Sequence, residues 1–195
     1  MRIISGSLKG RSMNFIKNST TRPLKDSVKE NIFNILEHFQ EVKVKINNAN
    51  VLDLYSGTGS FGLECISRGS KKVTFVEHDK KALQILKKNL TQNSVLNKSI
   101  IINDTINNYL KDCKNKFNII FFDPPFVDKE YIRYLSIIRK NKIHLSKHII
   151  IIHRERKTND NLDNDICSLK IKQYGRSKLI FAICPTNQQL IHLEL

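Results

Sequence analysis

The 195-residue chain is predicted to fold as one α/β domain built on a mostly parallel sheet with a C-terminal antiparallel hairpin. From residue 51 onward, short apolar segments alternate with amphipathic segments of helical period. Strands that alternate with helices form parallel sheets covered on both faces. Near the C-terminus, the apolar segments 169–174 and 179–184 flank a short turn with no helix between them, which predicts the hairpin.

Residues 1–26 are expected to form a small basic β-hairpin arm in front of the main domain at residues 27–195. The segments 2–6 and 11–15 are short and partly apolar, and a turn lies between them. Basic side chains crowd this region, where Asp26 is the first acid. Such an arm suits contact with phosphates, although a polar surface edge rich in lysine would have the same composition. The candidate nucleic-acid-binding residues are Arg2, Lys9, Arg11, Arg22 and Lys25.

A helix and then the alternating elements are expected after the arm. Ser27 and Glu30 have the spacing of a capping box, and apolar residues repeat at helical period from Val28 to Phe39. The expected strands are residues 51–54, 72–77, 100–102, 117–122 and 148–152. The expected helices between them are residues 61–66, 80–90 and 131–138.

Composition narrows the classes of function. Lys and Arg number 33 against 18 Asp and Glu, a net charge of +15, which favours nucleic acid or an anionic membrane surface as partner. An A·T-rich genome that fills surface positions with lysine would explain part of this excess. No stretch approaches the roughly 18–20 apolar residues of a spanning helix, and the first residues lack the apolar core of a secretory signal. Four scattered cysteines without a C-x-x-C motif indicate reduced thiols in a cytoplasmic protein, and no histidine pattern predicts a metal site.

A glycine-rich turn follows the first strand of the alternating region. Gly57, Gly59 and Gly62 satisfy the pattern G-x-G-x-x-G, Ser56 precedes them, and Glu77 ends the second strand. Glycines allow a sharp turn and close approach of the backbone to a ligand, and an acid at the second strand end can accept ribose hydroxyls. The pattern predicts a nucleotide-type cofactor site, and a simple tight strand-to-helix turn is the alternative.

Asp53 favours one kind of cofactor. This carboxylate lies within the first strand, where it would repel a pyrophosphate but would suit a cationic ligand such as the aminoacyl end of S-adenosylmethionine. The spacing from Asp53 through the glycines to Glu77 resembles motifs I and II of class I methyltransferases. Asp104, after the third strand, matches the position that binds the adenine amine in that family, and a helix cap before Thr105 is the alternative.

A second motif, Asp123-Pro124-Pro125-Phe126, comes directly after the fourth predicted strand. Two prolines could simply end the strand. Ligands of open α/β sheets, however, bind at the carboxyl ends of the strands, and the tetrapeptide resembles motif IV of enzymes that methylate exocyclic or amide nitrogens. Asp123 and the carbonyl of Pro124 could each accept an N–H of such a nitrogen, and Phe126 offers a face on which a base stacks.

Most of the chain resembles the RsmD family, bacterial methyltransferases that act on a guanine N2 of 16S ribosomal RNA. The matching segments are residues 2–6, 9–11, 21–33, 57–64, 123–126 and 174–175. The resemblance implies a seven-stranded Rossmann-like class I methyltransferase fold, S-adenosylmethionine as methyl donor, and 16S rRNA or the small ribosomal subunit as partner. One departure is visible, because His153-Arg154 stands after the fifth strand where an acidic residue is expected, and we assign this pair no role.

Three other functions remain open at this point. A DNA adenine or protein glutamine N-methyltransferase would share the second motif, although the glutamine enzymes usually have Asn at the position of Asp123. A nicotinamide-dependent dehydrogenase is disfavoured by Asp53 and by the lack of a Tyr-x-x-x-Lys set. A non-catalytic RNA-binding module has no need of Asp53, Glu77 and Asp123, all of which are present. A monomer without a membrane partner is expected.

Overall fold

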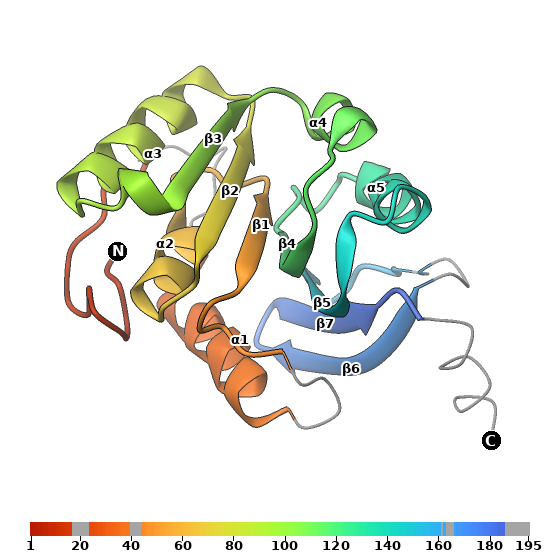
Figure 1. The fold of residues 1–195 in the computed structure, drawn as a ribbon. Coiled ribbons are helices and arrows are strands. Elements are labelled where there is room, and N and C mark those ends of the chain that lie inside the picture. The colour runs from red at the N-terminus through yellow and green to blue at the C-terminus, as the bar shows by residue number, and fades with distance from the viewer. Residues whose placement is uncertain (17–23, 40–43, 161, 163–165, 186–195) are drawn as a thin grey trace.

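The computed structural model describes residues 1–16, 24–39, 44–160, 162 and 166–185 (Figure 1). Seven strands form one sheet in the order β3-β2-β1-β4-β5-β7-β6. The strands are β1 (Asn50–Leu54), β2 (Lys72–Glu77), β3 (Ser99–Asn103), β4 (Phe117–Phe122), β5 (His144–Glu155), β6 (Cys167–Tyr174) and β7 (Ser177–Ile183). The first five are parallel, and β7 is antiparallel to both β5 and β6, which confirms the predicted sheet and hairpin.

The helices cover both faces of the sheet (Figure 1). They are α1 (Asp26–His38), α2 (Ser60–Ser67), α3 (Lys80–Gln92), α4 (Ile106–Asp112) and α5 (Glu130–Lys140), with a short 3-10 helix, η1 (Leu96–Lys98). Successive strand residues point to opposite faces, so Phe121 packs in the core with α1, α2 and α3, whereas Phe122 packs in the core with α4 and α5. Within the described residues, no helix has the length and apolar character to cross a bilayer.

The order of the strands places a crevice beside β1. The strands that follow β1 in the chain, β2 and β3, lie on one side of β1, whereas β4 lies on its other side, so the strand order reverses at β1. In open α/β sheets, ligands bind at this point, outside the carboxyl ends of the strands. The turns that follow β1 and β4, which hold both predicted motifs, therefore meet at the same place.

Two local predictions were wrong in detail. The predicted capping box is absent, because α1 begins at Asp26 and Ser27 already lies inside the helix, which has no side-chain cap. The fifth strand is longer than its apolar part, since β5 runs from His144 to Glu155 and carries polar residues at both ends. Neighbouring strands β4 and β7 hold these polar ends in the sheet.

The N-terminal segment forms the expected turn, but it is not free of the domain. Arg2 and Ser12 make a single antiparallel bridge, but neither of the segments 2–6 and 11–15 forms a strand, so the predicted hairpin is reduced to this bridge and its turn. The side chains of Ile3, Leu8 and Met13 are buried in the same core as α1, α2 and α3. The boundary expected at residue 26 therefore does not separate two cores.

Candidate functional site

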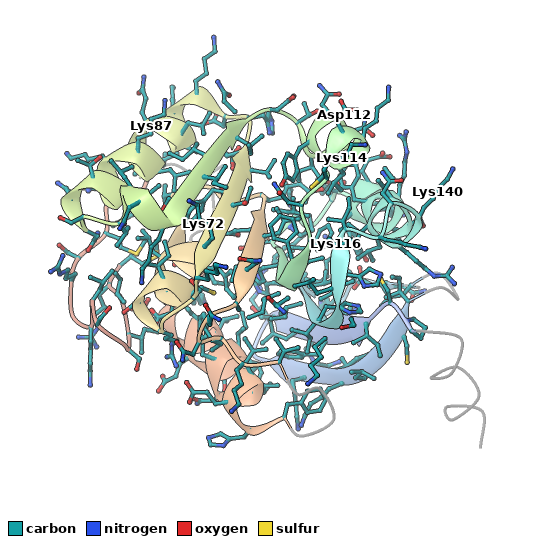
Figure 2. The ribbon with its side chains drawn as sticks, viewed as in Figure 1. Lys72, Lys87, Asp112, Lys114, Lys116 and Lys140 are labelled. Carbon is teal, nitrogen blue, oxygen red and sulfur yellow. The ribbon has the colours of Figure 1, made fainter. Side chains whose placement is uncertain are left out.

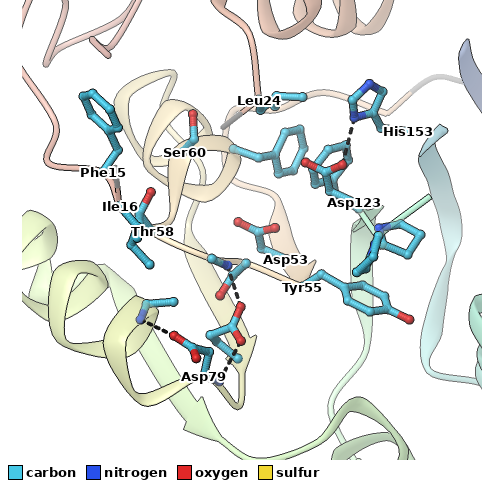
Figure 3. A pocket seen from close by; sticks show the side chains of 18 of the residues that line it. Phe15, Ile16, Leu24, Asp53, Tyr55, Thr58, Ser60, Asp79, Asp123 and His153 are labelled. Carbon is cyan, nitrogen blue, oxygen red and sulfur yellow. Dashed lines mark hydrogen bonds and ion pairs between the residues drawn. The ribbon is translucent and has the colours of Figure 1, made fainter. Parts of the chain in front are cut away.

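A cavity of about 510 Å³ opens beyond the carboxyl ends of β1, β2 and β4 (Figure 3). Its walls come from the turn after β1, the end of β2 with the start of α3, the turn after β4, and His153 on β5. Met1, Phe15 and Leu24 complete it from the N-terminal part of the chain. This apolar wall could not be predicted from the sequence, because no local pattern relates these side chains to the glycine motif.

The cavity is acidic although the protein is strongly basic. Asp53, Glu77, Asp79 and Asp123 line it, and no described Lys or Arg side chain does. Burial raises the pKa of Asp53 well above its usual range; the Gly62 N–H lowers it, and the charges of Asp123 and Glu77 raise it further. A bound cation would offset this accumulation of negative charge, whereas a pyrophosphate would add to it. The cavity therefore suits a cationic ligand.

The turn after β1 leaves its backbone open to such a ligand. Gly57 has a φ of +53°, and a Cβ there would meet nothing within 4 Å. Gly59, which does not line the cavity, has a φ of +86°, and a Cβ there would lie 2.5 Å from Leu86 Cδ1, so any other residue would be strained. The Ser56 hydroxyl is buried with no hydrogen-bond partner among the described residues. Buried polar atoms are normally paired, so the turn is built to contact a ligand.

Hydrogen bonds to the Glu77 carboxylate link this turn to the end of β2. One carboxylate oxygen, Oε2, accepts the Gly57 N–H at 2.8 Å, while Oε1 accepts the N–H groups of His78 at 2.8 Å and Asp79 at 2.9 Å (Figure 3). A carboxylate offers about four acceptor positions, so about one remains for a ligand hydroxyl.

Asp104 does not line the cavity. Its Oδ1 accepts the Thr105 N–H at 2.7 Å and the Asn108 side-chain amide at 2.9 Å, at the start of α4. Thr105 is the N-cap of that helix. Asp104 therefore lies directly before the cap and is not the cap itself, and its contact with the adenine amine stays a prediction.

All four residues of the second motif line the cavity. The Asp123 side chain is 23% exposed, and its Oδ1 lies 2.8 Å from His153 Nδ1 (Figure 3). Tyr55, at the end of β1, donates its hydroxyl to Asp128 Oδ2 at 2.7 Å and so joins the two turns. The motif was predicted from the sequence, but its contacts with His153 and Tyr55 were not.

Arg154 holds the motif turn from the side of the protein interior. Its side chain is 2% exposed, and it donates to the carbonyls of Pro125 at 3.1 Å and Phe126 at 2.9 Å. The Arg154 Nε also donates to Asp160 Oδ1 at 2.9 Å. Burial would raise the pKa of Asp160, but hydrogen bonds from Lys178 and three other side chains lower it to about 2. The guanidinium is thus paired with an ionised carboxylate and kept in place.

The four predicted nucleic-acid-binding residues that the structure describes lie outside the cavity. Arg2, Lys9, Arg11 and Lys25 are exposed, and Arg22 lies outside the described residues. Arg2 and Lys9 line a separate surface groove that also holds acidic residues of α1. The structure therefore separates the basic candidates from the acidic cavity.

A histidine and cysteine cluster was not expected from the sequence. His144, His148 and Cys184 place their potential ligand atoms within 4.8 Å of one another. The Cys184 backbone N–H, however, donates to His148 Nε2 at 2.9 Å. Burial, followed by His144, lowers the pKa of His148 to about 4, so its ring is neutral and carries its proton on Nδ1. A metal ion would have to break this hydrogen bond, so the cluster is not a preformed metal site.

Comparison with known proteins agrees with the fold and the motifs. The model of a family described as Conserved hypothetical protein 95 matches residues 1–183. The ribosomal RNA small subunit methyltransferase D of Buchnera aphidicola subsp. Acyrthosiphon pisum is 31% identical over 94% of this chain and 93% of its own length. The protein of the same name from Haemophilus influenzae is 39% identical over 65% of this chain and 64% of its own.

A solved structure of a candidate methyltransferase from Escherichia coli has a TM-score of 0.79 at 26% identity, covering 93% of this chain and 96% of that one. The fold, the two motifs at one cavity and the match over nearly the whole length agree with one another. The chain therefore belongs to the ribosomal RNA small subunit methyltransferase D family and is a methyltransferase of the Rossmann-like class I fold.

Proposed function

We propose that this enzyme transfers the methyl group of S-adenosylmethionine to the exocyclic N2 of a guanine in 16S ribosomal RNA. The observation that carries the proposal is an acidic cavity, suited to a cationic cofactor, with Asp123, Pro124 and Phe126 at its wall. The proposed substrate is naked rRNA or the small ribosomal subunit, and the proposed working form is a monomer in the cytoplasm.

The residues of the cavity fit S-adenosylmethionine. A volume of about 510 Å³ lies within the usual range for small-molecule sites. The unpaired Ser56 hydroxyl, the open backbone of Gly57 and the remaining acceptor position of Glu77 would bind its polar groups. Asp53 would face its positive charge. When bound, this cofactor supplies an electrophilic methyl group on a positively charged sulfur.

The motif turn would prepare the acceptor nitrogen. An exocyclic amine is a poor nucleophile, because its lone pair is delocalised into the base. Asp123 and the Pro124 carbonyl would each accept one N–H and so direct the lone pair toward the methyl group, while Phe126 stacks on the base. Arg154 binds the carbonyls of Pro125 and Phe126, so it does not compete for that of Pro124. The proton released from the nitrogen passes to Asp123 or to water.

Loss of the Glu77 carboxylate should weaken cofactor binding. We expect Glu77→Ala to reduce the affinity for S-adenosylmethionine by about 2–3 kcal/mol, because hydrogen bonds to a charged group have this magnitude. Isothermal titration calorimetry measures the change. The exposed Asp112 on α4, outside the cavity, supplies the matched control Asp112→Ala, which should leave the affinity unchanged. Equal affinities for the two variants would contradict the role of Glu77.

The distribution of positive charge on the surface indicates where RNA phosphates could bind. Lysine side chains project from α3 at Lys87, from α5 at Lys140 and from the connection between α4 and β4 at Lys114 (Figure 2). The positive charge is therefore not confined to the N-terminal segment. The exposed Arg2, Lys9, Arg11 and Lys25 are proposed as phosphate contacts on the strength of the sequence resemblance and their exposure, and Arg22 is proposed on the resemblance alone.

A single substitution tests this arm better than a deletion, because removing residues 1–17 would also remove Ile3, Leu8 and Met13 from the core. For Lys9→Gln, the slope of log K against log salt should shrink by roughly 0.7–0.9, the effect of one lost phosphate contact. Lys172→Gln, on the distant edge strand β6, should leave the slope unchanged. Filter binding over a salt series measures both. Identical slopes would show that Lys9 does not contact the RNA backbone.

The activity itself is tested by mass spectrometry of nucleosides from 16S rRNA of a deletion strain. One N2-methylguanosine should be lost and should return with the wild-type gene. Transfer of labelled methyl groups to naked rRNA and to small subunits then identifies the substrate form. Methylation of DNA adenine or of protein glutamine in place of guanine would contradict the proposal.

A further inference from the structure

At the wall of the cavity, His153 contacts Asp123 (Figure 3), and on its other side it contacts Ser177, which does not line the cavity. Its Nδ1 lies 2.8 Å from Asp123 Oδ1, and its Nε2 lies 3.0 Å from Ser177 Oγ. The side chain of His153 is 6% exposed, and Ser177 is buried. Three segments that are distant in the sequence thus meet in one line of contacts.

The chemistry of the three groups fixes the direction of the first bond. An ionised carboxylate only accepts hydrogen bonds, so Nδ1 of His153 carries a hydrogen and donates it to Asp123. In a neutral ring, Nε2 then accepts the Ser177 hydroxyl; in a charged ring, Nε2 donates to Ser177 Oγ. In both states the Asp123 Oδ1 is occupied. Among the described residues, no partner is found for its Oδ2.

Rigid elements support this line of contacts. His153 lies in β5, where it pairs with Leu179 of β7, and Ser177 begins β7 opposite Glu155. The His153 ring also meets the Phe126 ring edge-on, with centroids 6.0 Å apart. One imidazole therefore contacts both side chains of the motif that would face a base.

We propose that His153 is a positioning residue, which holds the Asp123 carboxylate by Oδ1 so that Oδ2 faces the target amine, with Ser177 fixing the imidazole. This inference rests on the proposed function and deepens it. It also gives a role to a histidine that stands where the resemblance led us to expect an acid. A displaced Asp123 would still fill the cavity but would no longer aim the nitrogen, and misplacement by about 1 Å can lower a rate roughly 100-fold.

The test compares two substitutions of His153 in the full chain. His153→Leu should lower kcat for methyl transfer by about 10- to 100-fold, with KM for RNA and Kd for S-adenosylmethionine changed by less than about 3-fold. His153→Asn should keep kcat within about 5-fold of wild type, because its side-chain N–H reproduces the position of Nδ1–H. A merely structural role would affect both variants alike and would appear in KM and thermal stability. Equal loss of kcat in both variants would overturn the proposal.

A double-mutant cycle provides the second criterion. If His153 acts through Asp123, then His153→Leu should have no further effect in an Asp123→Ala background, because coupled residues are not additive. A further 10-fold or greater loss would overturn the inference. If the wild-type enzyme methylates adenine or glutamine instead of guanine, the proposed substrate fails, and the same cycle with that acceptor still decides the role of His153.

Discussion

Replacing Asp123 with alanine is expected to lower kcat at least ~100-fold, the scale of removing one positioned transition-state partner. The Asp123 side chain is partly exposed at the cavity, and one of its oxygens is already bound by His153. The other oxygen would accept an N–H of the target nitrogen, and alanine offers no acceptor. Affinity for S-adenosylmethionine should stay nearly intact, because Glu77 and the turn after β1 are unchanged. Single-turnover kinetics and calorimetry measure the two quantities separately.

Asp123→Asn is the matched control for this experiment. Asparagine keeps one acceptor oxygen and nearly the same volume, so it should retain more turnover than alanine. If Asp123→Ala keeps its rate within a few-fold of wild type, the carboxylate has only a structural role. In that case the motif would serve as a strand exit that is held by Arg154.

The sheet and the motifs could be predicted because their signals are local. Residues 117–122 form an uninterrupted, mostly apolar strand followed by two prolines, and the structure places β4 and its turn there. The glycines after β1 likewise indicate a turn, because Gly57 and Gly59 have positive φ values that other residues rarely adopt. Parallel strands bring their carboxyl ends to one edge, so both motifs had to meet once the strand order was right.

The contacts that complete the site could not be predicted, because they join distant parts of the chain. His153 is 30 residues from Asp123 and 24 from Ser177. Only the register of β5 against β4 and β7 brings these side chains together. Single-sequence patterns contain no information on that register. Polar residues at the end of an otherwise apolar strand were the one available signal, since a buried polar side chain needs a partner.

Glu64 likewise joins parts of the chain that are distant in the sequence, because it binds the N-terminal segment. Of the substitutions considered, its replacement should lower the stability of the fold most. Its carboxylate on α2 is 0% exposed and accepts the N–H groups of Ile4 at 2.8 Å and Ser5 at 2.9 Å. It also lies 3.8 Å from the Nζ of Lys29, whose side chain is 0% exposed. Burial lowers the pKa of Lys29, and Glu64 is the first of the groups that raise it. Breaking such a buried pair typically costs about 3–5 kcal/mol, so Glu64→Ala should lower the free energy of unfolding by this amount.

Urea unfolding measures the effect, and Glu37→Ala is the matched control. Arg68 pairs with both carboxylates, with Glu64 at 2.9 Å and with Glu37 at 2.6 Å, but the Glu37 side chain is 47% exposed. An exposed pair contributes less than about 1 kcal/mol, so the control should stay close to wild type. Because Met1 lines the cavity, loosening the N-terminal segment in Glu64→Ala should also weaken cofactor binding, whereas Glu37→Ala should not. Equal stabilities for the two variants would mean that Ile3, Leu8 and Met13 hold the segment without the buried charge pair.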